Sequence, residues 1–288
     1  MNESHKVKII ADSTCDLSPE LIKKYDVEII PLYVTLGDES LKDGVDITPD
    51  ELYAWADEHK TTPKTAAITQ EDACEVFKKY ADQGYEIVYT GISSEMSVSY
   101  GTVQMAAKEF PNTPIAVVDS KNLSTGVGHT VIRAAELAQE GLGALEIKEE
   151  LDKFTPLVRA SFVVDTITYL YRGGRCSAVA AFGATALNLK PSIVVENGKM
   201  RPDAKYHGKI DRALKKYVQN MIPSLLQARP DRVFITHSGS SEETIAMVKS
   251  YVDELNYFKE VLITRAGCVI SSHCGPGTLG VLYVEQDK

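Results

Sequence analysis

The 288-residue chain has a formal net charge of −9, and hydrophobic residues make up 44% of it. A protein that binds nucleic acid through the phosphate backbone needs a basic face, so this charge argues against that class. No apolar run reaches the ~20 residues of a membrane-spanning helix, and we expect no membrane span. The cysteines form no CxxC pair, which argues against a structural zinc site and favours a reducing cytoplasm; they are Cys15, Cys74, Cys176, Cys268 and Cys274.

Strand and helix patterns alternate along the first half of the chain. Strands are expected at KVKIIAD (6–12), VEIIPLYVTL (27–36), EIVYTGIS (86–93) and PIAVVDS (114–120). Three of the expected helices begin at the N-caps Ser18, Thr48 and Thr69. Buried Val/Ile-rich strands, each followed by a helix, are typical of a parallel sheet with helices on both faces.

The alternation restarts near residue 159 and adds an antiparallel element. Asn197-Gly198 predicts the turn of a hairpin in SIVVENGKMRPDAKY (192–206). Further strands are expected at 160–166, 231–237, 260–267 and 278–285, and helices at 177–190, 210–226 and 241–255. The sequence therefore predicts two α/β domains, 1–155 and 156–288, with a mixed sheet in the second.

Polar or glycine-rich segments follow several of these strands. They are ADSTCDLS (11–18), TTPKTAAIT (61–69), ISSEMSVSYGT (92–102), VVDSKNLSTGVGH (117–129), YRGGRCS (171–177) and SSHCGPGT (271–278). In open α/β sheets, ligands bind outside the carboxyl ends of the strands. Ser97, near the start of a predicted helix, suits a carboxylate or phosphate, because hydroxyls and free helix amides bind anions without full charge. The alternative is that these serines only cap helices and form turns.

A catalytic apparatus is not recognisable in the sequence. It contains no GxSxG elbow, no GxxxxGK[ST] phosphate loop and no HExxH metal motif. Ser97, His273 and Asp119 could be assembled into a triad, but nothing in their spacing requires it. We therefore predict no catalytic residue, no metal and no cofactor.

The order of the motifs resembles the DegV family of bacterial fatty-acid-binding proteins. The resemblance spans nearly the whole chain, through ADSTCDL, PKTAAIT, ISSEMSVSY, VVDS, YLYRGGRCS, LKPSI and HCGPGTLG in this order. It implies a two-domain α/β protein with one long-chain fatty acid, such as palmitate or stearate, buried near the domain interface. It also implies a partner, the catalytic protein of a fatty acid kinase, which phosphorylates the bound carboxylate while the DegV-like chain presents it.

The same resemblance assigns residues to the site. The fatty-acid carboxylate is expected at Thr65 and Ser97, with Ser94 as the next candidate, and with His273 and Arg175 close by. Arg201, in GKMRPDAK, matches a basic region expected to face the kinase. Two stretches depart from the family pattern, TAAIT (65–69) and SVSYGTV (97–103), and Val98 in place of glycine narrows the room beside Ser97.

Other interpretations of these residues stay open. His273 could only hydrogen-bond the Gly-Pro-Gly turn that follows it, and Arg175 could pair with an acid such as Asp165. As a whole, the chain could be a hydrolase or phosphotransferase that uses Ser97 and His273. It could also be a carrier of a lipid other than a fatty acid.

Overall fold

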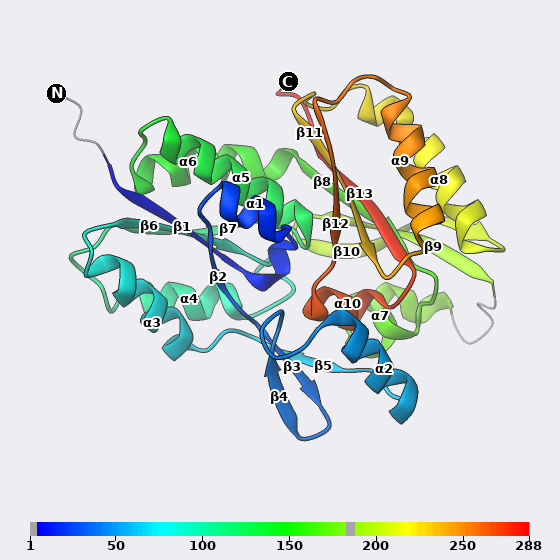
Figure 1. The fold of residues 1–288 in the computed structure, drawn as a ribbon, viewed down its shortest axis with the longest axis horizontal. Helices are drawn as coiled ribbons and strands as arrows, with labels where there is room; N and C mark the ends of the chain where they lie inside the picture. Colours follow the sequence, from blue (N-terminus) through cyan, green and yellow to red (C-terminus); the bar gives the residue numbers. More distant parts are fainter. Residues whose placement is uncertain (1–4, 183–187, 288) are drawn as a thin grey trace.

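The computed structural model describes residues 5–182 and 188–287. Its first sheet has the order β2-β1-β6-β7 with every pair parallel, as the alternating pattern predicted (Figure 1). The strands are β1 (Val7–Asp12), β2 (Glu28–Ile30), β6 (Glu86–Gly91) and β7 (Ile115–Asp119). Successive residues of β1 pack into different cores, Ile10 into one and Ile9 and Ala11 into the other, because side chains alternate along a strand.

Helices cover both faces of this sheet. Figure 1 shows α3 and α4 on one face and α5 and α6 on the other. The predicted N-caps are confirmed: the side chains of Ser18, Thr48 and Thr69 accept hydrogen bonds from the first turns of α1, α2 and α3. The helices are α1 (Pro19–Lys24), α2 (Pro49–His59), α3 (Gln70–Ala81), α4 (Ser99–Ala107), α5 (Thr125–Gln139) and α6 (Ala144–Phe154).

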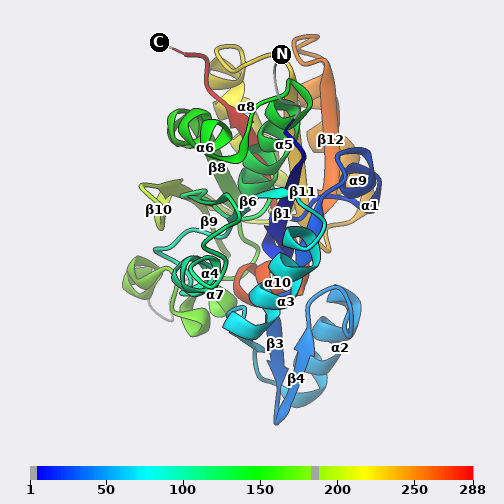
Figure 2. The same cartoon turned by 90° about the vertical axis from the view of Figure 1, so that its left-hand side faces the viewer.

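A small antiparallel sheet, β4-β3-β5, projects from the first domain together with α2 (Figure 2). Its strands are β3 (Tyr33–Leu36), β4 (Glu39–Lys42) and β5 (Lys64–Ala66). The single strand predicted at 27–36 is therefore wrong, because Pro31 lacks the N–H that a ladder requires and separates β2 from β3. The segment predicted as a loop around residue 65 is likewise a strand, paired with β3.

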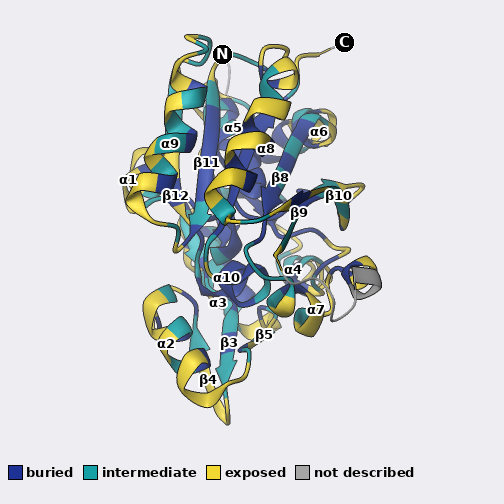
Figure 3. Ribbon diagram, turned by 90° about the vertical axis from the view of Figure 1, so that its right-hand side faces the viewer, coloured by how far each residue is buried: buried dark blue, intermediate teal, exposed yellow. Residues whose placement is uncertain are grey.

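The second domain holds a six-stranded mixed sheet of order β10-β9-β8-β13-β11-β12, in which only β11 and β12 pair in parallel. Helices α8 (Ile210–Leu225) and α9 (Glu242–Asp253) pack on one face and turn exposed sides to solvent (Figure 3). The predicted hairpin is confirmed, with Asn197 and Gly198 both at positive φ. The strands are β8 (Val158–Val163), β9 (Leu189–Glu196), β10 (Lys199–His207), β11 (Arg232–Ser238), β12 (Glu260–Arg265) and β13 (Thr278–Val284).

Short helices connect these elements. They are α7 (Thr168–Gly173), α10 (Cys268–Cys274), and the 3-10 turns η1 (Ser13–Cys15), η2 (Thr155–Leu157) and η3 (Ser177–Phe182). The helix predicted over 177–190 is wrong at its end, because Leu189 and Lys190 belong to β9; residues 183–187 lie outside the described residues. Over the described ranges, no helix is both long and apolar enough to cross a membrane.

Helix α5 lies between the two sheets. It contacts β1 and β6 of the first sheet and β8 and β13 of the second. The Thr125 hydroxyl lies 2.6 Å from that of Thr236 on β11, and His129 Nε2 lies 3.2 Å from the carbonyl oxygen of Leu282 on β13. One apolar core therefore contains residues of both domains.

Candidate functional site

A cavity of about 450 Å³ is lined in part by the loop that follows β6. Its walls come from both domains: β5, the β6–α4 loop and the segment before α5 in the first, and α10, Arg175 and β10 in the second. The lining residues include the apolar Leu32, Ala66, Ala67, Ile92, Met96, Val98, Leu123, Met200, Val269 and Ile270. Ligand sites of this kind are apolar with a few placed polar groups.

Two of the expected site residues meet at this cavity. Thr65 on β5 and His273 on α10 are 208 positions apart, yet Thr65 Oγ1 and His273 Nε2 are 2.9 Å apart. Both line the cavity. His273 thus bonds a threonine of another domain, in addition to standing before the Gly-Pro-Gly turn.

His273 is held as a neutral imidazole. Burial, together with the nearby positive charge of Arg175, lowers its pKa to about 4. Its Nδ1 atom is buried and has no hydrogen-bond partner among the residues that the structure describes. At Gly173, a Cβ would come within 2.3 Å of Nδ1, so that glycine lets α7 approach the ring.

Ser97 lies in the turn that leads into α4. Its hydroxyl lies 2.9 Å from that of Ser99 and accepts a hydrogen bond from the Ser99 amide at 3.2 Å. Ser97 is half-buried and lines the cavity. The expected position before a helix N-terminus is confirmed, while Val98 is 73% exposed at the cavity wall.

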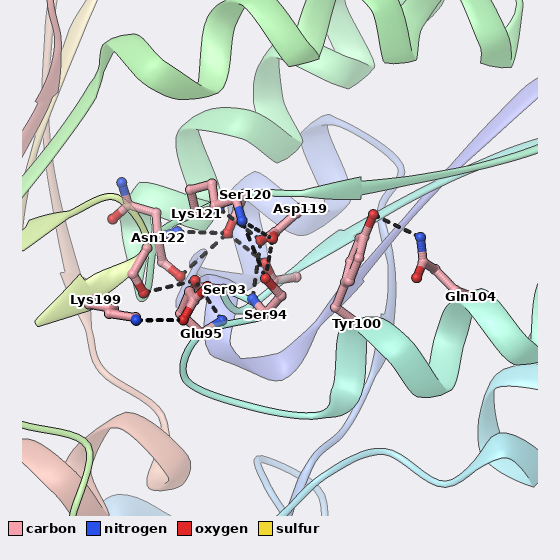
Figure 4. Close-up of polar contacts among 12 residues, drawn as sticks. Ser93, Ser94, Glu95, Tyr100, Gln104, Asp119, Ser120, Lys121, Asn122 and Lys199 are labelled. Carbon is pink, nitrogen blue, oxygen red and sulfur yellow. Dashed lines mark hydrogen bonds and ion pairs between the residues drawn. The ribbon is translucent and has the colours of Figure 1, made fainter.

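Ser94 differs from Ser97 because a carboxylate already engages it (Figure 4). Its hydroxyl donates to Asp119, and its amide donates to the same carboxylate at 3.2 Å. Burial alone would raise the pKa of Asp119, but hydrogen bonds from Lys121 and Ser94 outweigh it and hold that pKa below its usual value. Ser94 lines the cavity with its hydroxyl committed to an anion.

The two expected arginines lie in different places. Arg175 is exposed, lines the cavity, and donates from Nη1 to the Gly173 carbonyl at 2.9 Å. Asp165 pairs instead with Lys190, at 2.5 Å. Arg201 on β10 does not line this cavity; it pairs with Glu196 on the neighbouring strand and lines a separate groove of about 630 Å³.

Two buried carboxylates that the sequence analysis missed fix the start of α10. Asp43 accepts hydrogen bonds from the amides of Cys268 at 2.7 Å and Val269 at 3.3 Å, and Asp16 accepts one from Gly267 at 2.8 Å. Burial raises the pKa of both carboxyls. They place the helix that carries His273, and no local pattern in the sequence marked them as its partners.

The cavity adjoins a narrower apolar space of about 20 Å³ between the segment that precedes α5, helix α10 and the second sheet. Leu123, Ile270 and Cys274 line both spaces.

The hydrolase arrangement is not assembled here. The Ser97 hydroxyl bonds Ser99, whereas His273 Nε2 bonds Thr65. Asp119, the acid of the possible triad, accepts from Ser94 and pairs with Lys121 at 2.8 Å. A triad needs the base bonded to both the nucleophile and an orienting acid.

The fold and cavity define a two-domain α/β protein with a cavity lined by residues of both domains. The profile described as "Uncharacterised protein, DegV family" matches residues 6–286, and the chain belongs to this family. It is 32% identical over 283 residues to a DegV domain-containing protein of Clostridium perfringens, covering 98% of this chain and 99% of that protein.

Solved structures agree over the full length. A DegV family protein from Thermus thermophilus, described as fatty-acid binding, superposes with a TM-score of 0.89 at 30% identity, covering 98% of this chain and 100% of the other. A stearic-acid-binding protein from Eubacterium ventriosum gives a TM-score of 0.82 at 28% identity, over 97% and 98% of the two chains. The predicted family and two-domain α/β fold are confirmed.

Proposed function

We propose that this chain binds one long-chain fatty acid with its carboxylate at Thr65, Ser97 and His273. The observation that carries the proposal is the Thr65–His273 pair, in which a polar group from each domain meets at a largely apolar cavity. The tail then runs past Leu123 and Ile270 toward the space between the domains. The fatty-acid-binding relatives support this choice of ligand.

The apolar tail supplies most of the affinity. Each methylene removed from water contributes roughly 0.8 kcal/mol, so about fourteen give on the order of 11 kcal/mol before the costs of binding. A hydrogen bond to a charged carboxylate contributes about 1.5–3 kcal/mol. The polar groups therefore set the orientation of the ligand more than its affinity.

The head-group residues also suit a carboxylate that must react. Thr65 and Ser97 are uncharged, and His273 is neutral because its pKa is about 4. A guanidinium or ammonium in direct contact would lower the nucleophilicity of the carboxylate. Arg175, at the cavity wall, is the cation for steering the head group, and Ser94 contributes only if its hydroxyl leaves Asp119.

We further propose that the bound carboxylate is presented to a separate ATP-dependent kinase, which forms the acyl phosphate. Arg201 is exposed on β10, outside the fatty-acid cavity, and is our candidate for the kinase-facing residue. The five free cysteines favour a cytoplasmic location for this reaction.

Native mass spectrometry of the purified chain tests the ligand. We expect one fatty acid per chain, identified after denaturing extraction; a different lipid would make the chain another kind of carrier. Ester hydrolysis lost on Ser97→Ala would instead support the hydrolase. With a DegV-linked kinase added, Arg201→Glu should slow acyl-phosphate formation and leave fatty-acid affinity unchanged.

A further inference from the structure

The turn of the β9–β10 hairpin, in the second domain, rests on the head-group loop of the first (Figure 4). The head-group loop is the segment 93–98 between β6 and α4. The Ser93 hydroxyl donates to the Gly198 carbonyl at 2.8 Å, and Lys199 Nζ lies 3.0 Å from Glu95 Oε2. The only parts of the hairpin in these contacts are its turn and the first residue of β10.

Ser93 holds the head-group loop in shape. Its side chain is fully buried, and its amide donates to the Asn122 carbonyl at 2.9 Å. Its carbonyl accepts hydrogen bonds from the amides of Met96 at 2.9 Å and Ser97 at 3.1 Å, and its hydroxyl accepts one from the Glu95 amide at 3.2 Å. A shift of Ser93 therefore displaces Met96 and Ser97, which line the cavity.

Gly198 fits against this loop without spare room. Its φ is +80°, which disfavours any residue with a side chain. A Cβ at this position would lie 2.6 Å from Ser93 Oγ and 3.2 Å from Glu95 Cγ. A Cβ added at Gly198 must therefore displace either the head-group loop or the hairpin turn.

We propose that Ser93 is a positioning residue for the fatty-acid head group and that the Gly198 turn is its support. The proposal rests on the proposed function for its ligand. Ser93 acts through Ser97, because the Ser93 carbonyl accepts a hydrogen bond from the Ser97 amide. Because coupling between two binding events is reciprocal, a partner that moves β10 shifts fatty-acid affinity, and the fatty acid shifts partner affinity by the same factor.

The test compares Gly198→Ala with Gly208→Ala. Gly208, at the far end of β10, also has a positive φ (+97°), but a Cβ there meets nothing within 4 Å. Backbone strain is thus common to both variants, and only Gly198→Ala presses on Ser93. In ligand-free protein, Gly198→Ala should speed hydrogen exchange at the Met96 and Ser97 amides, while Gly208→Ala should match wild type there.

Fatty-acid affinity gives the second readout. Loss of one hydrogen bond predicts a roughly three- to tenfold weaker affinity for Gly198→Ala. In a Ser93→Ala background the same change should cost less, because the hydroxyl that the new carbon meets is gone. Lys199→Glu, an exposed change that repels Glu95, tests the contact again if Gly198→Ala does not fold.

The outcomes separate the two proposals. Equal loop exchange in Gly198→Ala and Gly208→Ala would overturn the role of the turn, whatever the ligand. Faster exchange with unchanged affinity would overturn the positioning of the head group. A wild-type chain that binds no fatty acid refutes the proposed function, while the exchange comparison still decides whether the turn supports the loop.

Discussion

Replacing Thr65 by valine removes one hydroxyl from the cavity and nearly conserves side-chain volume. The hydroxyl lies 2.9 Å from His273 Nε2. Nδ1 of the same ring is buried and has no hydrogen-bond partner among the described residues, so the variant removes the threonine partner of the other ring nitrogen as well. An unsatisfied buried polar group costs about 1–3 kcal/mol, which should appear as a lower free energy of unfolding.

The effect on ligand binding is larger if Thr65 holds the carboxylate. A hydrogen bond to a charged group is worth about 1.5–3 kcal/mol, so Thr65→Val should weaken fatty-acid binding roughly 10- to 150-fold. Displacement of a fluorescent fatty acid measures this affinity, and urea unfolding measures stability. Thr35→Val is the matched control, because Thr35 lies on the adjacent strand of the same sheet and outside the cavity. Affinity within twofold of wild type for Thr65→Val would refute the assignment.

Three further changes test the site from other sides. His273→Gln should make the free energy of unfolding depend less on pH in the acid range. In the wild type the pKa of His273 is about 4 folded against 6.5 unfolded, so its contribution to stability is complete above pH 6.5 and about 3 kcal/mol is lost as the pH falls through 4. Urea unfolding across this pH range measures the difference. Asp43→Asn should lower the free energy of unfolding by about 2–3 kcal/mol, because it weakens the acceptor for two amides of α10; an unchanged urea midpoint would contradict this. Ile270→Phe fills the passage toward the narrow space, so stearate should lose roughly fourfold in affinity per displaced methylene while laurate is spared; equal losses would contradict the proposed tail path.

Local chemistry made much of the fold predictable. The N-caps at Thr48 and Thr69 each bond an amide within the next three residues, and the Asn197-Gly198 turn depends on two adjacent backbone conformations. The strand at 27–36 failed because its halves join different sheets, and a continuous apolar run hides the interruption at Pro31.

The site was harder to predict because its residues come from elements that are far apart in the sequence. Thr65 and His273 are brought together by the docking of β5 against α10, which no spacing in the sequence reveals, so the family resemblance alone pointed to the pair. The apolar lining is scattered over many elements and reads as ordinary core. Asp16 and Asp43 hold α10 across more than 200 positions of sequence, and nothing local marked them as partners.

Helix α5 packs against both domains, so the two halves of the chain should be exchangeable between relatives only with difficulty. It belongs to the first half of the chain, yet it contacts β8 and β13, and Thr125 and His129 reach polar atoms of the second sheet. In a chimera of residues 1–155 of this chain with the second half of a relative about 30% identical, the side chains of α5 would no longer match those of the strands they contact. Exchange of halves between family members should therefore yield folded proteins only when the partners of α5 travel with it.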